Sequence, residues 1–224
     1  MPITPVQSSL IHKVIEPEGG GKPPYPTLIL LHGRGTNEDD LLGLVPYLDP
    51  RLLVISARAP FQFSMGGWTW YEILEVGNPH PRQFQESCNR LAQFLSDVKQ
   101  HYPVDPNRIF FLGFSMGTVM SFAMSLTKPQ EIAGVVAHSG YVPEHTHLTF
   151  AMDTLQNTSF FVAHGVHDPV IPVHFGRRAK ELLASANADL TYREYPIAHQ
   201  ISEESLSDLS GWLRLRLEAL QEKK

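Results

Sequence analysis

The 224-residue chain has a hydrophobic content of 42%, enough for one good core, and we expect a single α/β domain over residues 1–224. Its net charge of −5 and the lack of a block of basic residues argue against a nucleic-acid partner. No apolar run approaches the ~20 residues of a membrane span, the N-terminus lacks the pattern of a signal peptide, and the single cysteine allows no internal disulfide, so we expect a cytoplasmic protein without a membrane span.

Short apolar or alternating runs recur along the chain and predict strands. The first run alternates weakly and is typical of a sheet edge, and the last alternates as a partly exposed strand does. The runs between them are uniformly apolar, as buried parallel strands are. In chain order, the predicted strands cover residues 10–15, 27–31, 52–55, 108–112, 132–137, 160–163 and 190–195.

Amphipathic patterns between these runs predict five helices. Asn37 is a predicted cap of the first helix, because three acidic residues follow it, and Ser202 is a predicted cap of the last. Cys88 lies on the apolar stripe of the second helix, and we interpret it as a packing residue rather than a reactive thiol. The predicted helices cover residues 37–48, 84–102, 118–126, 173–186 and 202–220.

Strands that alternate with helices of about ten or more residues pair in parallel through right-handed crossovers. We therefore expect a mostly parallel sheet with helices on both faces. Residues 56–81, which are rich in aromatic residues, glycine and proline, and residues 139–158 remain irregular. Little of the chain remains beyond the sheet and the helices, so we expect no large cap domain, and we expect these two segments to roof a fairly open site.

A Gly-x-Ser-x-Gly pentapeptide, from Gly113 to Gly117, lies between a predicted strand and a predicted helix. This context is typical of a nucleophile elbow, in which a serine is held on a tight turn and the glycines leave room for neighbouring backbone. Ser115 is the predicted nucleophile. The alternative is a serine in an ordinary glycine-rich turn, since the pentapeptide alone is a weak signal.

Asp168 and His199 follow later predicted strands and supply the other two side chains that serine catalysis needs. An imidazole can take the serine proton near neutral pH, and a carboxylate can fix its tautomer. The chain order Ser, Asp, His is that of the α/β-hydrolase arrangement. Each residue also has a simpler interpretation, because Asp168 could start a turn before Pro169 and His199 could lie in a surface loop.

The turn His32-Gly33-Arg34-Gly35 follows another predicted strand. Acyl transfer builds charge on a carbonyl oxygen, and backbone N–H groups after the nucleophile and after an earlier strand commonly stabilise it. Met116 and Arg34 are the candidates for these two donors, although the turn could lack a catalytic role. The Arg34 side chain could pair with the nearby residues Glu38, Asp39 or Asp40, which we favour, or bind an anionic substrate at the site mouth.

Four neighbouring residues, His164, His167, Asp168 and His174, invite comparison with a metal site. The His-x-x-His pair contains a glycine and is followed closely by Pro169, so it cannot lie on a helix. It therefore lacks the spacing of familiar zinc sites. We expect neither a metal nor a cofactor.

Several motifs together resemble the phospholipase/carboxylesterase family of small α/β-hydrolases, which includes acyl-protein thioesterases and bacterial carboxylesterases. They are the segments 31–35, 113–117, 139–140, 164–165, 168–172 and 198–199, and the likeness extends from about residue 27 to about residue 211. The resemblance implies an α/β-hydrolase fold, metal-free hydrolysis of acyl esters or thioesters, the triad Ser115, Asp168 and His199, and an oxyanion hole of Arg34 and Met116. The aromatic segment 68–71 looks like one that flanks the family's active site, and the substrate-binding residues we expect are Gly35, Phe63, Trp70 and Val170.

The sequence thus predicts a serine carboxylesterase that acts on a small-molecule or acyl-chain ester through an acyl-enzyme. A non-catalytic scaffold of the same fold that binds a ligand or partner and a small serine peptidase are the two alternatives. A homodimer is compatible with the sequence.

Overall fold

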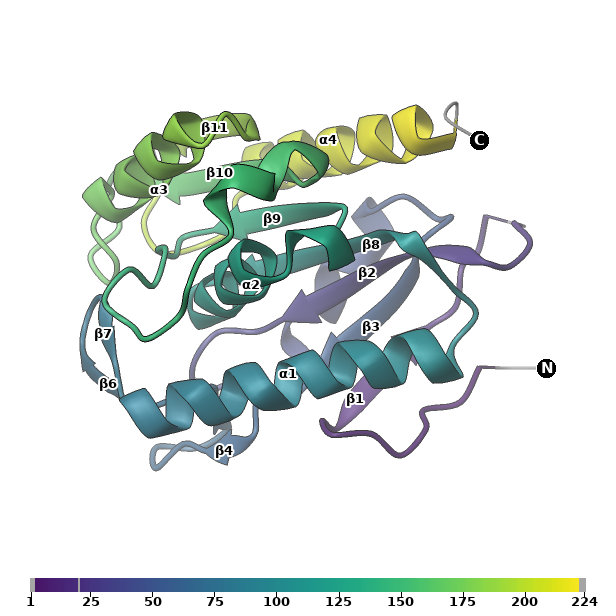
Figure 1. Cartoon of the computed structure of the whole chain (residues 1–224), viewed down its shortest axis with the longest axis horizontal. Coiled ribbons are helices and arrows are strands. Elements are labelled where there is room, and N and C mark those ends of the chain that lie inside the picture. Colours follow the sequence, from purple (N-terminus) through teal and green to yellow (C-terminus); the bar gives the residue numbers. More distant parts are fainter. Residues whose placement is uncertain (1–2, 20, 222–224) are drawn as a thin grey trace.

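A seven-stranded sheet with the order β1-β3-β2-β8-β9-β10-β11 runs through the molecule, shown in Figure 1 as a computed structural model. The structure describes residues 3–19 and 21–221, so residues 1–2, 20 and 222–224 of the predicted domain lie outside the described residues. β1 lies at the edge of the sheet, as predicted, and pairs with β3 in antiparallel fashion, whereas the other neighbours are parallel. The strands are β1 (His12–Ile15), β2 (Tyr25–Leu31), β3 (Leu53–Ala57), β8 (Val104–Phe114), β9 (Gly134–His138), β10 (Ser159–Gly165) and β11 (Asp189–Tyr195).

Helices cover both faces of the sheet, as the sequence predicts. On one face the core joins α1 (Pro81–His101), α2 (Met116–Thr127) and α3 (His174–Ser185) to the sheet. On the other face it joins the 3₁₀ helix η1 (Asp40–Tyr47) and α4 (Glu203–Gln221). β2 contributes to both cores because alternate side chains of a strand point to opposite faces. None of the helices among the described residues is long and apolar enough to cross a membrane.

Of the two predicted helix caps, the one at Ser202 is formed and the one at Asn37 is not. Ser202 caps α4, since its hydroxyl accepts the backbone N–H of Ser205 at 3.1 Å. Asn37 instead accepts the N–H of Asp39 at 2.8 Å in a turn, and the segment after it is the 3₁₀ helix η1 rather than the predicted helix from residue 37. Pro46 lies inside η1 and has no backbone N–H to donate, which is incompatible with a regular α-helix there.

The irregular segments contain short elements that the sequence does not reveal. Residues 56–81 hold two small antiparallel hairpins, and the 3₁₀ helices η2 (Pro129–Glu131) and η3 (Met152–Asn157) lie between longer elements. The hairpins pair β4 (Phe61–Gln62) with β5 (Trp68–Thr69), and β6 (Ile73–Glu75) with β7 (Asn78–Pro79).

The order of the strands places a crevice between β2 and β8. After β2 the chain moves outward to β3 and later returns to β8 on the other side of β2, so the connections leave these two neighbours in opposite directions. Their carboxyl ends are level, because Leu31 pairs with Gly113. Ligands of open α/β sheets bind at such a point, and here the two ends lead to Arg34 and to Ser115.

Candidate active site

Ser115 lies on a sharp turn between β8 and α2. Its backbone has φ 55° and ψ −117°, a strained conformation for a residue with a side chain. The turn closes tightly: a β-carbon on Gly113 would lie 2.4 Å from Gly117, and one on Gly117 would lie 1.8 Å from the carbonyl oxygen of Leu31. Both glycines of the pentapeptide are therefore needed for this turn, which presents Ser115 at the carboxyl edge of the sheet.

The loop that contains Arg34 lies against this turn and is held by hydrogen bonds. A β-carbon on Gly33 would lie 3.5 Å from the β-carbon of Ser115, so the loop is directly beside the serine. His32 fixes the loop from within, because its Nδ1 donates to the carbonyl of Gly33 at 2.6 Å while its Nε2 accepts the N–H of Ala59 at 3.0 Å. Burial lowers the pKa of His32, which favours this neutral ring.

Two backbone N–H groups at this point have no acceptor within the described part of the chain. They belong to Arg34, in the loop, and to Met116, the first residue of α2. The first N–H groups of a helix have no partner inside the helix, and they carry its positive end. These two N–H groups flank Ser115 and are free to donate to a ligand.

Asp168 and His199 form a hydrogen-bonded pair across the loops after β10 and β11. The Nδ1 of His199 lies 2.7 Å from Oδ2 of Asp168, whose side chain is fully buried. The other carboxylate oxygen, Oδ1, accepts the N–H groups of Val170 and Ile171 at 2.8 and 2.9 Å. Since a carboxylate only accepts, His199 carries its proton on Nδ1 and leaves Nε2 as a base.

His164, the penultimate residue of β10, supports the loop that contains Asp168. The sequence pattern did not reveal this supporting role. His164 is fully buried, and its Nε2 donates to the carbonyl of Ile171 at 2.7 Å and lies 3.6 Å from Oδ2 of Asp168. Burial lowers the pKa of His164, so the ring is neutral at physiological pH. In the described part of the chain, no three His, Cys, Asp or Glu side chains are grouped so that they could hold a metal ion.

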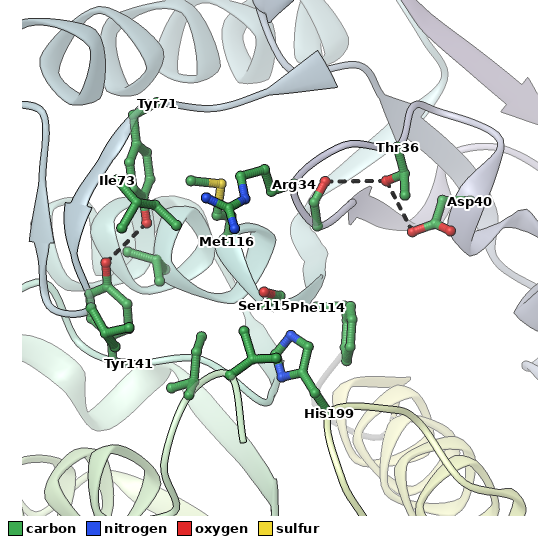
Figure 2. Close-up of a pocket in the computed structure, with 15 residues that line it drawn as sticks. Arg34, Thr36, Asp40, Tyr71, Ile73, Phe114, Ser115, Met116, Tyr141 and His199 are labelled. Carbon is green, nitrogen blue, oxygen red and sulfur yellow. Dashed lines mark hydrogen bonds between the residues drawn. The ribbon is translucent and has the colours of Figure 1, made fainter. Parts of the chain in front are cut away.

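Ser115 and His199 line the same cavity, which has a volume of about 400 Å³ (Figure 2). Between these two described side chains there is no direct hydrogen bond, and catalytic contacts of this kind commonly tighten only when substrate is bound. The ring of Phe114 packs against His199, with 4.9 Å between their centres. The remaining wall is mostly apolar and includes Ile73, Val76, Val119, Val170 and Ile171.

The predicted substrate-binding residues differ in where they lie. Val170 lines the cavity, whereas Gly35, Phe63 and Trp70 are not among its lining residues. Trp70 is fully buried and donates from Nε1 to the carbonyl of His32 at 2.9 Å, so it supports the Arg34 loop from behind. An aromatic segment in a sequence does not show which of its rings point inward, and here the neighbouring residue Tyr71 reaches the cavity instead.

The ion pairs that we favoured for Arg34 are not formed, and this part of the sequence prediction is wrong. Arg58 donates from Nε and Nη2 to the two carboxylate oxygens of Glu38, each at 2.5 Å, Asp39 pairs with Lys13, and Asp40 accepts from Thr36 at 3.2 Å. The Arg34 guanidinium instead lies over the ring of Phe63, 5.2 Å from its centre, and lines the cavity. The prediction relied on proximity in the sequence, whereas cations more distant in the sequence bind two of these carboxylates and a neighbouring hydroxyl donates to the third.

His138, at the end of β9, makes the fold sensitive to acid. It is fully buried between the hydroxyls of Ser139 and Ser205, at 3.0 and 3.1 Å, and burial lowers its pKa to about 3. The unfolded chain, in which this histidine has its ordinary pKa of ~6.5, binds more protons between these two values. The contribution of neutral His138 to stability is therefore present above its ordinary pKa of ~6.5 and is lost as the pH falls toward 3.

We expect His138 alone to lower the free energy of unfolding by about 2 kcal/mol between pH 7 and pH 5. Urea unfolding at the two pH values measures this difference in wild type, in His138→Gln and in the control His101→Gln, whose side chain is exposed. The pH difference should shrink only in His138→Gln. An equal loss in all three proteins would contradict the assignment.

The comparisons with known proteins agree on one family. The sequence model described as phospholipase/carboxylesterase matches residues 12–217. Acyl-protein thioesterase 1 of Candida albicans is 29% identical over 210 residues, which are 84% of this chain and 90% of that protein.

Solved structures give the same picture of the fold. A carboxylesterase from Bacillus cereus is 26% identical and superposes with a TM-score of 0.83 over 92% of this chain and 94% of its own. A carboxylesterase from Mesorhizobium loti is 20% identical and has a TM-score of 0.81, with 95% of this chain and 98% of that chain covered, so it shows a shared fold. The expected α/β-hydrolase fold is thereby confirmed.

Proposed function

Because the chain belongs to the phospholipase/carboxylesterase family, and the relatives named above are an acyl-protein thioesterase and carboxylesterases, we propose that Ser115, His199 and Asp168 are the catalytic triad of this enzyme. The observation that carries the proposal is the strained turn that holds Ser115 in the same cavity as a histidine whose Nδ1 is fixed by a buried carboxylate. That pair leaves Nε2 of His199 free to act as a base in the cavity that Ser115 lines.

In the first half of the reaction, Nε2 of His199 takes the hydroxyl proton while Ser115 attacks the acyl carbon. The carbonyl oxygen gains a full negative charge, and the unpartnered N–H groups of Arg34 and Met116 would donate to it. His199 then passes its proton to the leaving oxygen or sulfur, the bond to the acyl carbon breaks, and an acyl-enzyme remains on Ser115.

In the second half, a water molecule takes the place of the leaving group beside His199. Nε2 accepts one of its protons, the resulting hydroxide attacks the acyl carbon, and the oxyanion forms again at the same two N–H groups. The proton returns to Oγ of Ser115 as the acid leaves. No metal or organic cofactor enters either step.

The cavity supports an acyl substrate of modest size. Its lining is mostly apolar, and two exposed side chains, Val76 and Val170, stand 38% and 48% exposed at its rim. Apolar surface in contact with an acyl chain stabilises the complex by about 25 cal/mol for each Å² removed from water. The single cysteine fits a cytoplasmic location, which stays a prediction, as does a homodimer.

A fluorophosphonate probe tests the proposed function directly, because it reacts covalently only with an activated serine. We expect complete labelling of the wild-type protein, with the adduct found by mass spectrometry on the peptide that contains Ser115, and no labelling of Ser115→Ala. A folded wild-type protein that stays unlabelled would favour a non-catalytic scaffold.

A further inference from the structure

Arg34 is an exposed residue that lines the cavity, and the described residues offer its guanidinium no carboxylate partner. The acidic residues nearest in sequence are bound elsewhere, and the ring of Phe63 supports the guanidinium at 5.2 Å. Figure 2 shows the side chain turned toward Tyr71 and Met116, whereas Asp40 lies on the other side of the loop. A guanidinium held in this way offers its N–H groups to an anion in the cavity.

The hydroxyls of Tyr71 and Tyr141 lie on the same wall and add a second donor. They are hydrogen-bonded to each other at 3.2 Å, and both residues line the cavity although Tyr71 is fully buried and Tyr141 is 4% exposed. Each hydroxyl has one proton, and the bond between them uses only one. Among the described residues no acceptor takes the other proton, so one buried O–H is available to a ligand.

Arg34 and this hydroxyl pair face the same region of the cavity. All three residues line it, and Figure 2 shows the guanidinium turned toward Tyr71. A ligand group between them would accept hydrogen bonds from both. A carboxylate suits this set because it is planar, singly charged and an acceptor only.

The position of His199 decides which part of the substrate carries the carboxylate. The leaving atom must face His199, which protonates it, so the acyl chain extends away from that ring. In Figure 2 the Tyr71–Tyr141 pair and the Arg34 guanidinium lie on the side of Ser115 away from the His199 ring. The acyl chain must also be short, because one residue would contact both of its ends. The backbone N–H of Arg34 would bind the oxyanion, and the guanidinium of Arg34 would bind the carboxylate.

From these contacts, and on the basis of the function proposed above, we propose that Arg34 and the Tyr71–Tyr141 hydroxyl pair form a carboxylate subsite, and that the enzyme prefers monoesters or monothioesters of short dicarboxylic acids. Asp40 also lines the cavity, but it lies across the Arg34 loop from the guanidinium, and its carboxylate would repel an anion placed near it.

Two esters of nearly equal shape test the subsite. The monoethyl ester of glutaric acid carries the carboxylate, and the ethyl ester of glutaric acid monoamide replaces it with a neutral amide. We expect kcat/KM of the wild-type enzyme to be at least about tenfold higher for the carboxylate, the usual effect of one hydrogen-bonded charge. The corresponding succinic and adipic esters then show which chain length fits.

The ratio of the two kcat/KM values is the readout for the variants, because any disturbance of the Arg34 backbone affects both esters alike. Arg34→Leu should lower this ratio about tenfold, Arg34→Lys less, since the charge stays and the planar fork is lost, and Tyr71→Phe by a few-fold. The matched control is Arg90→Leu, which removes an exposed arginine paired with Glu86 on α1. It should leave the ratio unchanged.

A wild-type ratio near one, or a ratio that Arg34→Leu leaves unchanged, would overturn the carboxylate subsite. The same holds if the enzyme is labelled by the fluorophosphonate probe but hydrolyses neither ester. Labelling of Ser115 needs no carboxylate, so it reports the proposed catalytic function independently. Absence of labelling would reject that function itself.

Discussion

Replacement of Ser115 by alanine is expected to lower kcat for ester hydrolysis by roughly five to six orders of magnitude, while the protein stays folded. The reason is that the acyl-enzyme cannot form without the hydroxyl, and water at the same place lacks its fixed position. The β-carbon is kept, so the strained turn at φ 55° is as accessible to alanine as to serine. Steady-state rates on a neutral ester and the thermal unfolding midpoint measure the two halves of this expectation.

The double variant makes the test sharper. Members of a triad act as a unit, so His199→Ala alone and Ser115→Ala with His199→Ala should be about as inactive as Ser115→Ala. If the two losses multiplied, or if Ser115→Ala kept more than a tenth of the wild-type rate, Ser115 would not be the nucleophile.

The strands, and the positions of the three candidate residues after them, are the parts that the sequence predicts well, for a physical reason. The inner parallel strands are uniformly apolar and the last strand alternates, and Ser115, Asp168 and His199 follow the ends of such strands, where the sheet topology brings distant segments together. The predicted strand at residues 160–163 and the observed β10 thus lead to the same loop with Asp168. A local sequence pattern is enough to predict where a residue lies when the order of the strands in the sheet places it.

The walls of the cavity are less predictable because they depend on side-chain direction in irregular segments. Tyr71 and Tyr141 come from two different loops, and only the packing of those loops brings their hydroxyls to 3.2 Å. Trp70, one residue away from Tyr71, points behind the Arg34 loop instead. A period of two or 3.6 residues assigns faces within strands and helices, but such loops have no period from which a face could be read.

The partners of charged side chains are equally hard to read from sequence distance. Arg34 has three acidic residues within six positions, yet Arg58 and Lys13 bind two of them because β1 and β3 bring these cations to the loop. The structure thus leaves Arg34 to face the cavity. An exposed pair also contributes little, since water screens it, so proximity alone provides a weak driving force for the predicted contact.

Asp168→Asn is expected to lower kcat by about four orders of magnitude through the tautomer of His199. The N–H groups of Val170 and Ile171 both donate to Oδ1 of Asp168, so an asparagine will place its oxygen there and its NH₂ toward His199. Nδ1 of His199 must then accept, and the ring proton moves to Nε2. A ring protonated at Nε2 cannot take the proton of Ser115.

Nitrogen NMR of the imidazole ring distinguishes this cause from a simple loss of structure. Wild type should show the proton of the neutral ring on Nδ1, and Asp168→Asn should show it on Nε2, with an unchanged unfolding midpoint. Asp153→Asn is the matched control, because Asp153 is exposed in η3, before the first residue of β10 and so at the opposite end of that strand from Asp168. A loss of less than a hundredfold in Asp168→Asn, or an Nδ1 proton that persists in it, would mean that Asp168 does not orient the base.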